Sequence, residues 1–197
     1  MTPINCEKII LASGSPRRHE LLTQAGICFE TLVADIDETS VPYKNDPGAY
    51  VQILSGQKAE HSACQDPEAW TLGADTIVMA DNTILGKPCD HDHAVSMLTS
   101  LSGRAHSVFT GMTLVCPAKS MARSLTVDTR VWFKSLSQKE IFWYASTDEP
   151  YDKAGGYGIQ GIGAFMVQKI QGSYSNVVGL PVCELIEILT ELQVIQF

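Results

Sequence analysis

The sequence predicts an α/β fold with a mixed, twisted sheet flanked by helices. In the first half of the chain, apolar runs of strand length alternate with stretches of helical periodicity, which favours parallel pairing. In the middle, two strand-like runs follow one another with no helix between them, so antiparallel pairing is expected as well. A chain of 197 residues can bury one sizeable core, and we predict a single domain covering residues 1–197.

The first elements predicted are a strand over residues 9–12, a tight turn at residues 13–15 and a helix. Ser15 is a suitable N-cap, and Pro16 suits the first helical position because its missing N–H has no helical partner there anyway. Gly26 can end this helix. Backbone amides and the positive end of the helix dipole therefore converge on the turn, which favours the binding of an anion.

Alternation, capping residues and turn residues locate the other elements. We expect the chain to leave the sheet at the acidic segment 35–39, a turn at Asp81-Asn82 and a capping box from Ser137 to Glu140. Further strands are predicted over residues 28–34, 72–79, 108–116, 124–133 and 164–170. Further helices are predicted over residues 47–58, 91–101, 138–146 and 182–192.

The composition indicates a soluble globular protein, because 45% of the residues are hydrophobic and 18% are charged. A net charge of −8 argues against a surface that coats nucleic acid, but it permits a pocket for a single nucleotide. No apolar run reaches the roughly 18 residues of a membrane span, and the N-terminus lacks the layout of a secretory signal. The six scattered cysteines are expected to be reduced and buried, which favours a cytoplasmic location.

The turn after the first strand carries side chains that suit phosphate oxygens. Arg17 and Arg18 add two planar guanidinium groups, and Ser13 and Ser15 add two hydroxyls. We interpret this stretch as a site for a polyphosphate. The alternative is an ordinary strand–turn–helix corner with two solvated arginines.

Two carboxylates are candidates for a metal site. Asp75 lies among apolar residues near a predicted strand end, and burying it is costly unless it is paired or binds a metal, although it can also be a turn former. Glu38 follows another strand, and two converging carboxylates can hold Mg²⁺. We expect Asp35 and Asp37 to be solvated.

Two lysines are candidate phosphate contacts. Lys58 lies on a predicted helix, where a single lysine is normally a solvated charge. Lys87 is better placed, because Gly86 and Pro88 restrict the direction of the backbone on either side. In the helix of Lys58, Gly56 lowers stability by up to ~1 kcal/mol relative to alanine.

Together and in order, these motifs resemble those of the Maf family of nucleotide pyrophosphatases. The resemblance runs from about Ile9 to Leu192, and its motifs are residues 13–18, 37–38, 58–59, 73–76, 86–88, 154–161 and 176–181. It implies a fold like that of the Maf and inosine-triphosphatase proteins, a nucleoside triphosphate substrate, a divalent cation (Mg²⁺ or Mn²⁺) and a homodimer.

The resemblance also implies roles for individual residues. Asp75 would be the general base and, with Glu38, a metal ligand, and Lys58 and Lys87 would be catalytic. The phosphates would be surrounded by these two lysines and by Ser13, Ser15, Arg17 and Arg18. A water molecule deprotonated by Asp75 would attack the α-phosphorus, releasing the monophosphate and pyrophosphate.

Three positions resemble the branch of the family that hydrolyses dTTP and UTP, with 5-modified pyrimidine nucleotides as further candidates. They are Arg17 after the turn, Thr76 after the aspartate and Gln160 in the glycine-rich stretch. The amide of Gln160 can pair with N3–H and O4 of a uracil ring, which is a hypothesis from its donor and acceptor groups. The sister branch prefers methylated guanine nucleotides.

Two other functions stay open at this point. A non-catalytic nucleotide sensor linked to cell division would keep the arginine pair but would need no metal-binding carboxylates. A general phosphatase would release orthophosphate in place of pyrophosphate.

Three other motifs are weaker. Residues 156–161 match G-x-G-x-x-G, but no strand precedes them and no helix pattern follows. The cluster from Cys89 to His93 lacks a second Cys/His pair at zinc-finger spacing, and Asp90 or Asp92 fits better as a helix cap. A serine hydrolase is disfavoured because no G-x-S-x-G occurs and His19 would lie one turn along the first helix.

Overall fold

The computed structural model describes residues 3–197, which group into two compact units. Unit 1 contains the described residues up to Asp75 together with residues 110–127 and 179–197, and unit 2 contains residues 76–109 and 128–178. Three strands contribute residues to both units: β4 (Trp70–Ala80), β6 (Ala105–Cys116) and β7 (Met121–Phe133). The single domain expected over residues 1–197 therefore stays a prediction.

The sheet is mixed, as predicted. Its strand order is β3-β2-β4-β6-β7-β8, and β5 (Thr83–Leu85) pairs with β4. The short strand β2 (Ile9–Leu11) is parallel to both β3 (Glu30–Thr31) and β4, whereas β4–β5 and β7–β8 (Val167–Gln171) are antiparallel pairs. Near the two ends of the chain, β1 (Ile4–Asn5) and β9 (Ile195–Gln196) form a separate antiparallel pair.

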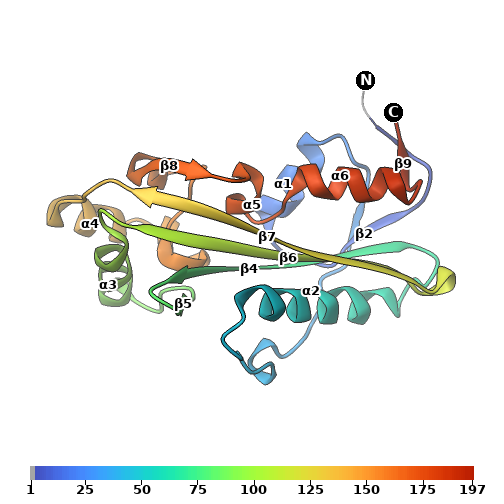
Figure 1. Ribbon diagram of the computed structural model, residues 1–197, viewed down its shortest axis with the longest axis horizontal. Coiled ribbons are helices and arrows are strands. Elements are labelled where there is room, and N and C mark those ends of the chain that lie inside the picture. Colours follow the sequence, from blue (N-terminus) through green and yellow to red (C-terminus); the bar gives the residue numbers. More distant parts are fainter. Residues whose placement is uncertain (1–2) are drawn as a thin grey trace. The chain divides into compact units, whose positions relative to one another are not determined.

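In unit 1, helices lie on both sides of the strands. Figure 1 shows α1 (Pro16–Gln24) and α6 (Val182–Glu191) on one side and α2 (Pro47–Ala63) on the other. The backbone of α2 contacts the strands directly at two glycines. A Cβ atom at Gly73 would lie 2.1 Å from the Ser55 carbonyl oxygen, and one at Gly111 would lie 2.4 Å from that of Val51. Only glycine leaves room for this approach.

The glycine-terminated end predicted for α1 is confirmed, and at its start the predicted N-cap residue is present but makes no side-chain capping bond. Ser15 occupies the N-cap position and Pro16 begins the helix, as predicted, although the Ser15 hydroxyl makes no capping hydrogen bond. Its backbone amide instead donates to Ser13 Oγ at 3.2 Å. At the other end, Gly26 has a φ of +74° and the Ile27 amide donates to the Leu22 carbonyl at 3.1 Å, which is the glycine-terminated helix end expected.

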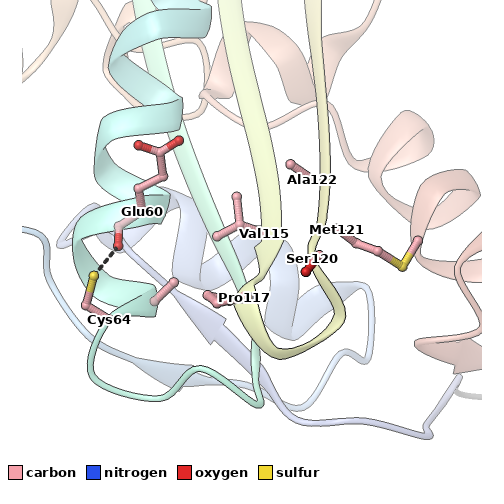
Figure 2. Close-up of a pocket in the computed structure, with 8 residues that line it drawn as sticks. Glu60, Cys64, Val115, Pro117, Ser120, Met121 and Ala122 are labelled. Atoms are coloured by element: carbon pink, nitrogen blue, oxygen red, sulfur yellow. Dashed lines mark hydrogen bonds between the residues drawn. The ribbon is translucent and has the colours of Figure 1, made fainter.

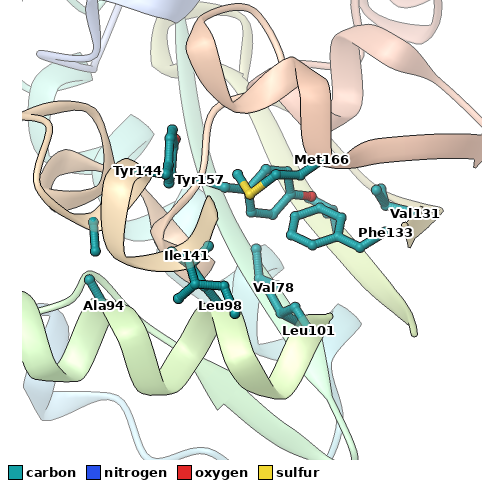
Figure 3. Packing of buried hydrophobic residues seen from close by; sticks show 12 residues of the cluster. Val78, Ala94, Leu98, Leu101, Val131, Phe133, Ile141, Tyr144, Tyr157 and Met166 are labelled. Atoms are coloured by element: carbon teal, nitrogen blue, oxygen red, sulfur yellow. The ribbon is translucent and has the colours of Figure 1, made fainter. Parts of the chain in front are cut away.

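Unit 2 is built around its own apolar cluster (Figure 3). Helix α3 (His91–Leu101) packs on α4 (Gln138–Ala145), and both cover residues of β6 and β7. The glycine-rich segment and the turn after it also contribute. The buried members are Val78, Ala94, Leu98, Leu101, Val108, Val131, Phe133, Ile141, Tyr144, Ala145, Tyr157 and Met166.

Several element bounds differ from the prediction. The strand expected over residues 28–34 is reduced to β3, and the strand expected from residue 164 begins only at Val167, because residues Ile162–Met166 form the 3₁₀ turn η5. The sequence also predicted neither β5 nor the short helix α5 (Tyr174–Val178). The turn at Asp81-Asn82 is confirmed, with φ angles of +48° and +62°.

The cysteines correct a second expectation. All six lie in the described range and all are free thiols, but five are exposed and only Cys116 is buried. The expectation of buried thiols is therefore wrong for five of them. Among residues 3–197, no helix combines the length and the apolar character that a membrane crossing requires.

The predicted capping box at the start of α4 is confirmed. The Glu140 amide donates to Ser137 Oγ at 3.3 Å, and the Ser137 amide donates to Glu140 Oε2 at 2.7 Å. Lys134 Nζ donates to Glu140 Oε1 at 2.6 Å. The bond from Lys134, followed by those from Ser137, lowers the pKa of Glu140 to about 2.

We expect Glu140→Gln to lower Tm at pH 7 and to lose this effect in acid. A carboxylate whose pKa is lowered by folding stabilises the protein above its unfolded pKa, and this contribution disappears as pH falls through the folded pKa. The Tm difference between wild type and Glu140→Gln should therefore shrink from pH 5 to pH 2 in thermal unfolding scans. The exposed Glu68→Gln serves as a control, and a difference independent of pH would contradict the prediction.

Candidate active site

The centre of the candidate site in unit 1 is a lysine between two carboxylates. Lys58 Nζ lies 2.6 Å from Asp75 Oδ1 and 2.8 Å from Glu38 Oε1. The side chains of Lys58 and Asp75 are only 12% and 10% exposed, whereas Glu38 is 53% exposed. Lys58 is therefore not the solvated charge that a helical lysine normally is, and the two predicted metal-binding carboxylates do converge.

Packing of α2 on β4 explains how Lys58 reaches Asp75. Gly73 and Asp75 are two residues apart on a strand and so face the same side of the sheet. On that side, the Gly73 position contacts the α2 backbone at Ser55 and Ala59, which brings the neighbouring Lys58 opposite Asp75.

The structure corrects the expected position of Asp75. It lies in the interior of the 11-residue strand β4 and not near a strand end, so the alternative of a turn former is excluded. With 7% of its surface exposed, this carboxylate depends on its lysine partner for compensation.

Glu38 is positioned by a short turn after β3. Residues Glu38–Ser40 form the 3₁₀ turn η1, which Asp37 caps by accepting from the Thr39 amide at 3.0 Å and from the Thr39 hydroxyl at 2.6 Å. The hydrogen bond from the Thr39 hydroxyl is the main reason that the pKa of Asp37 is lowered. Asp35 and Asp37 are exposed, as expected.

Arg18 is the buried arginine of the pair. Its Nη1 donates to Ser13 Oγ at 3.1 Å and its Nε donates to the carbonyl oxygen of Gly179 at 2.8 Å. Burial lowers its pKa, and the charges of Asp75 and Glu38 act in the opposite direction, so both carboxylates lie within electrostatic reach of this guanidinium. Arginine stays charged in proteins, and Arg18 is therefore a buried cation beside the two acids.

Arg17 is half-buried, and its positive charge contributes to the lowered pKa of Arg18. The structure thus brings the loop of Ser13, both arginines and the Lys58 centre into one unit. The surroundings of Ser13 and His19 do not favour a serine hydrolase, because Ser13 Oγ accepts from Arg18 and the His19 ring packs edge-to-face on Phe29 with ring centroids 4.8 Å apart.

Two participants were missed by sequence reasoning. The carbonyl of Gly179 holds Arg18, and its only signal was its place in the motif at residues 176–181. Tyr50 on α2 has its pKa raised by burial and then by the charges of Asp75 and Glu38, which places its phenol near the same acids. No local pattern distinguished Tyr50 from other helical aromatic residues.

The remaining predicted site residues belong to unit 2. Thr76 follows Asp75 in β4 and is half-buried, whereas Lys87 and Gln160 are exposed. The segments that carry Lys87 and Gln160 are linked, because the Gly155 amide donates to the Gly86 carbonyl at 3.0 Å. Roles for these three residues toward a substrate stay predictions.

The cluster from Cys89 to His93 behaves as a helix start. Asp90 Oδ1 accepts from the His93 amide at 2.7 Å and so caps α3, as expected, while Cys89 Sγ lies 3.2 Å from His93 Nδ1. Hydrogen bonding from that amide is the main reason that the pKa of Asp90 is lowered.

Figure 2 shows a pocket of about 290 Å³ in unit 1, beside the end of α2 and the turn between β6 and β7. It is lined by Glu60, Ala63, Cys64, Val115, Pro117, Ser120, Met121 and Ala122. None of the predicted site residues lines this pocket. Its walls are mostly apolar and hold no cationic side chain, so it does not suit a phosphate chain.

The donor set of the site fits a divalent cation that also binds substrate. Within residues 3–197, no group of three or more histidine, cysteine, aspartate or glutamate side chains can hold a metal ion. Mg²⁺ nevertheless needs only one or two protein carboxylates when substrate phosphates and waters complete its shell. Glu38 and Asp75 form such a pair, because both contact the Lys58 ammonium. Glu38 and Asp75 are the residues of this site that would hold such an ion.

Comparison with known proteins supports one family over nearly the whole chain. Residues 8–192 match the family described as Maf-like protein. A protein of Myxococcus xanthus is 50% identical over 182 residues, which are 92% of this chain and 90% of the relative. A protein of Syntrophus aciditrophicus is 48% identical over 193 residues, or 97% and 93% of the two chains, and one of Bacillus cereus is 45% identical over 187 residues, or 95% and 96%. Each of these relatives is named dTTP/UTP pyrophosphatase.

Proposed function

The chain belongs to the Maf-like protein family, and we propose that it is a dTTP/UTP pyrophosphatase that converts a nucleoside triphosphate and water into the monophosphate and pyrophosphate. The observation that carries this proposal is the cluster in unit 1. It combines a buried arginine, a lysine and two carboxylates, which are the groups required to bind phosphates and to activate water. The relatives that bear this name match over nearly their full length.

Asp75 is proposed as the general base. A carboxylate in a partly dehydrated site can accept a proton from an attacking water at the moment when the bond to the α-phosphorus forms. Lys58 orients Asp75 through the 2.6 Å contact. The proton then resides on Asp75 and the leaving group is pyrophosphate.

The cations of unit 1 are proposed to bind the triphosphate. Arg18 is held rigidly by Ser13 and Gly179, so it offers its charge with little loss of side-chain entropy. Arg17, Lys58 and the N-terminus of α1 add positive potential near the same loop. Charge that develops on the phosphoryl oxygens is thereby stabilised.

Glu38 and Asp75 are proposed to hold Mg²⁺ or Mn²⁺, which would neutralise phosphate charge and lower the pKa of a bound water. We expect chelation of divalent cations to abolish pyrophosphate release and added Mg²⁺ or Mn²⁺ to restore it. The assay is pyrophosphate release from dTTP with and without chelator. Full turnover in metal-free buffer would contradict this part of the proposal.

Base recognition is proposed to depend on Gln160, whose amide can pair with the N3–H and O4 groups of uracil or thymine. The six free thiols support a reducing compartment, and we propose the cytoplasm. The homodimer implied by the family resemblance stays a prediction, which size-exclusion chromatography with light scattering can test.

The decisive experiment is a screen of the purified protein against all common nucleoside triphosphates with Mg²⁺ or Mn²⁺, scored by product. We expect dTTP and UTP to be the best substrates and pyrophosphate to be the product. Release of orthophosphate would favour a general phosphatase. Nucleotide binding without turnover would favour the non-catalytic sensor.

A further inference from the structure

The loop that carries Gln160 is held by a half-buried acid outside the candidate site, Glu149. The Gln160 loop, residues 158–163, follows the 3₁₀ turn η4 (Ala154–Gly156) of unit 2 and includes the first two residues of η5, and Gln160 is exposed in its middle. The Ile162 amide donates to Glu149 Oε2 at 2.7 Å, and the Gly163 amide donates to Glu149 Oε1 at 2.9 Å. One carboxylate therefore binds two consecutive amides just after Gln160.

A tyrosine holds the other side of the same loop. Tyr144 Oη donates to Glu149 Oε1 at 2.9 Å and accepts from the Gly158 amide at 3.1 Å. Tyr144 is fully buried in the apolar cluster of unit 2 (Figure 3), so its hydroxyl has a defined position. Together, the two side chains attach the backbone on both sides of Gln160 to the core of the unit.

The glycines of this loop leave room for these two side chains. A Cβ atom at Gly161 would lie 2.3 Å from Glu149 Oε2, and one at Gly163 would lie 2.7 Å from Tyr144 Oη. Neither glycine has a positive φ, so close contact and not backbone conformation requires glycine here. For Gly161, the last glycine of the G-x-G-x-x-G pattern, the contact with Glu149 is an explanation unrelated to dinucleotide binding.

The ionisation of Glu149 suits this arrangement. Burial by itself raises its pKa, but the hydrogen bonds from Gly163, Ile162 and Tyr144 outweigh that effect, so the pKa is lowered. An ionised carboxylate only accepts hydrogen bonds, and all three partners are donors.

We propose that Glu149, acting with Tyr144, is a positioning residue that holds the Gln160 loop in place and thereby determines the selectivity for uracil and thymine. This inference rests on the proposed function, because it assumes that Gln160 contacts the base. A glutamine on a mobile loop would lose part of its binding energy to ordering. The same residue on a loop held on both sides is ready to bind.

Glu149→Gln is the central variant. Each carboxylate oxygen accepts from a backbone amide, so in either orientation the new NH₂ group of glutamine would face an N–H donor and lose one of these hydrogen bonds. We expect KM for dTTP to rise and the ratio of kcat/KM for dTTP to that for dCTP to fall by about tenfold, with kcat little changed. Tyr144→Phe should act in the same direction, since it removes one acceptor and one donor while keeping the ring. Asp148→Asn is the matched control, since it removes a neighbouring exposed carboxylate.

Two measurements separate positioning from general destabilisation. In a Gln160→Ala background, Glu149→Gln should cause no further loss of dTTP selectivity, because its effect passes through Gln160. Hydrogen exchange of the Gly158, Ile162 and Gly163 amides should accelerate in Glu149→Gln and not in Asp148→Asn. If Glu149→Gln unfolds at the assay temperature, Tyr144→Phe is used in both measurements.

The outcomes distinguish the two proposals. An unaltered dTTP/dCTP ratio in the Glu149 and Tyr144 variants, or an undiminished effect in the Gln160→Ala background, overturns the positioning role while the wild-type activity stands. If the ratio of kcat/KM for dTTP to that for dCTP is the same in Gln160→Ala as in wild type, the positioning role is also overturned. A wild-type protein that releases no pyrophosphate from any triphosphate overturns the proposed function itself.

Discussion

Asp75→Asn is expected to reduce pyrophosphate release by about 10²–10⁴-fold, the range that a general base contributes. Asparagine has nearly the same shape, and its amide oxygen can still accept from Lys58 in place of the carboxylate at 2.6 Å. It cannot take a proton from water at neutral pH. The loss should therefore appear in kcat, with the fold preserved.

The measurement is pyrophosphate release together with binding of a non-hydrolysable dTTP analogue and circular dichroism. Asp35→Asn is the matched control, because it removes an exposed carboxylate from the acidic segment before Glu38 and should leave turnover unchanged. Near-normal release by Asp75→Asn would refute the role of Asp75 as base. Loss of analogue binding would indicate that its main contribution is to the metal or phosphate site.

Gly73→Ala is expected to destabilise the protein by about 3 kcal/mol and to abolish activity, because the added Cβ overpacks the contact between β4 and α2. That atom would lie 2.1 Å from the Ser55 carbonyl oxygen and 2.6 Å from the Ala59 nitrogen, and both belong to helix backbone that cannot rotate away. Relief requires α2 to move off the strand. Such a shift would also separate Lys58 from Asp75.

Gly56→Ala provides a control with the same chemical change in the same helix. A Cβ at Gly56 would have Thr113 Oγ1 at 3.9 Å as its nearest neighbour, so there is space for it. Alanine at this position should stabilise the helix by up to ~1 kcal/mol. Urea unfolding of both variants tests the pair, and equal stability of Gly73→Ala and wild type would contradict the packing argument.

Local chemistry made part of this structure predictable. Asp46, Asp90 and Ser137 each accept a backbone hydrogen bond at the start of a helix, as their side chains allow in any context. Asp81-Asn82 adopts the left-handed turn that these residue types tolerate. These features involve residues that are close in the sequence, so a local pattern contains most of the information about them.

The candidate site was predictable only as a set of residues. The motifs identified Glu38, Lys58 and Asp75, but nothing in the sequence indicated that the lysine would bind both acids. The interior position of Asp75 in β4 and the burial of Lys58 follow from the close approach of α2 at Gly73. That approach depends on two elements that are separate in the chain, and no periodicity within either of them reports it.

The sequence by itself therefore determined the order of the elements, the ends of several helices and the chemical types of the site residues, because these depend on side chains and their immediate neighbours. Tertiary structure alone decided which charges meet and which loops are held. Glu149 illustrates the difference: its sequence context is that of an exposed turn, and only packing brings its carboxylate to the amides of Ile162 and Gly163. Hydrogen bonds between distant segments form only when the core that brings those segments together has folded.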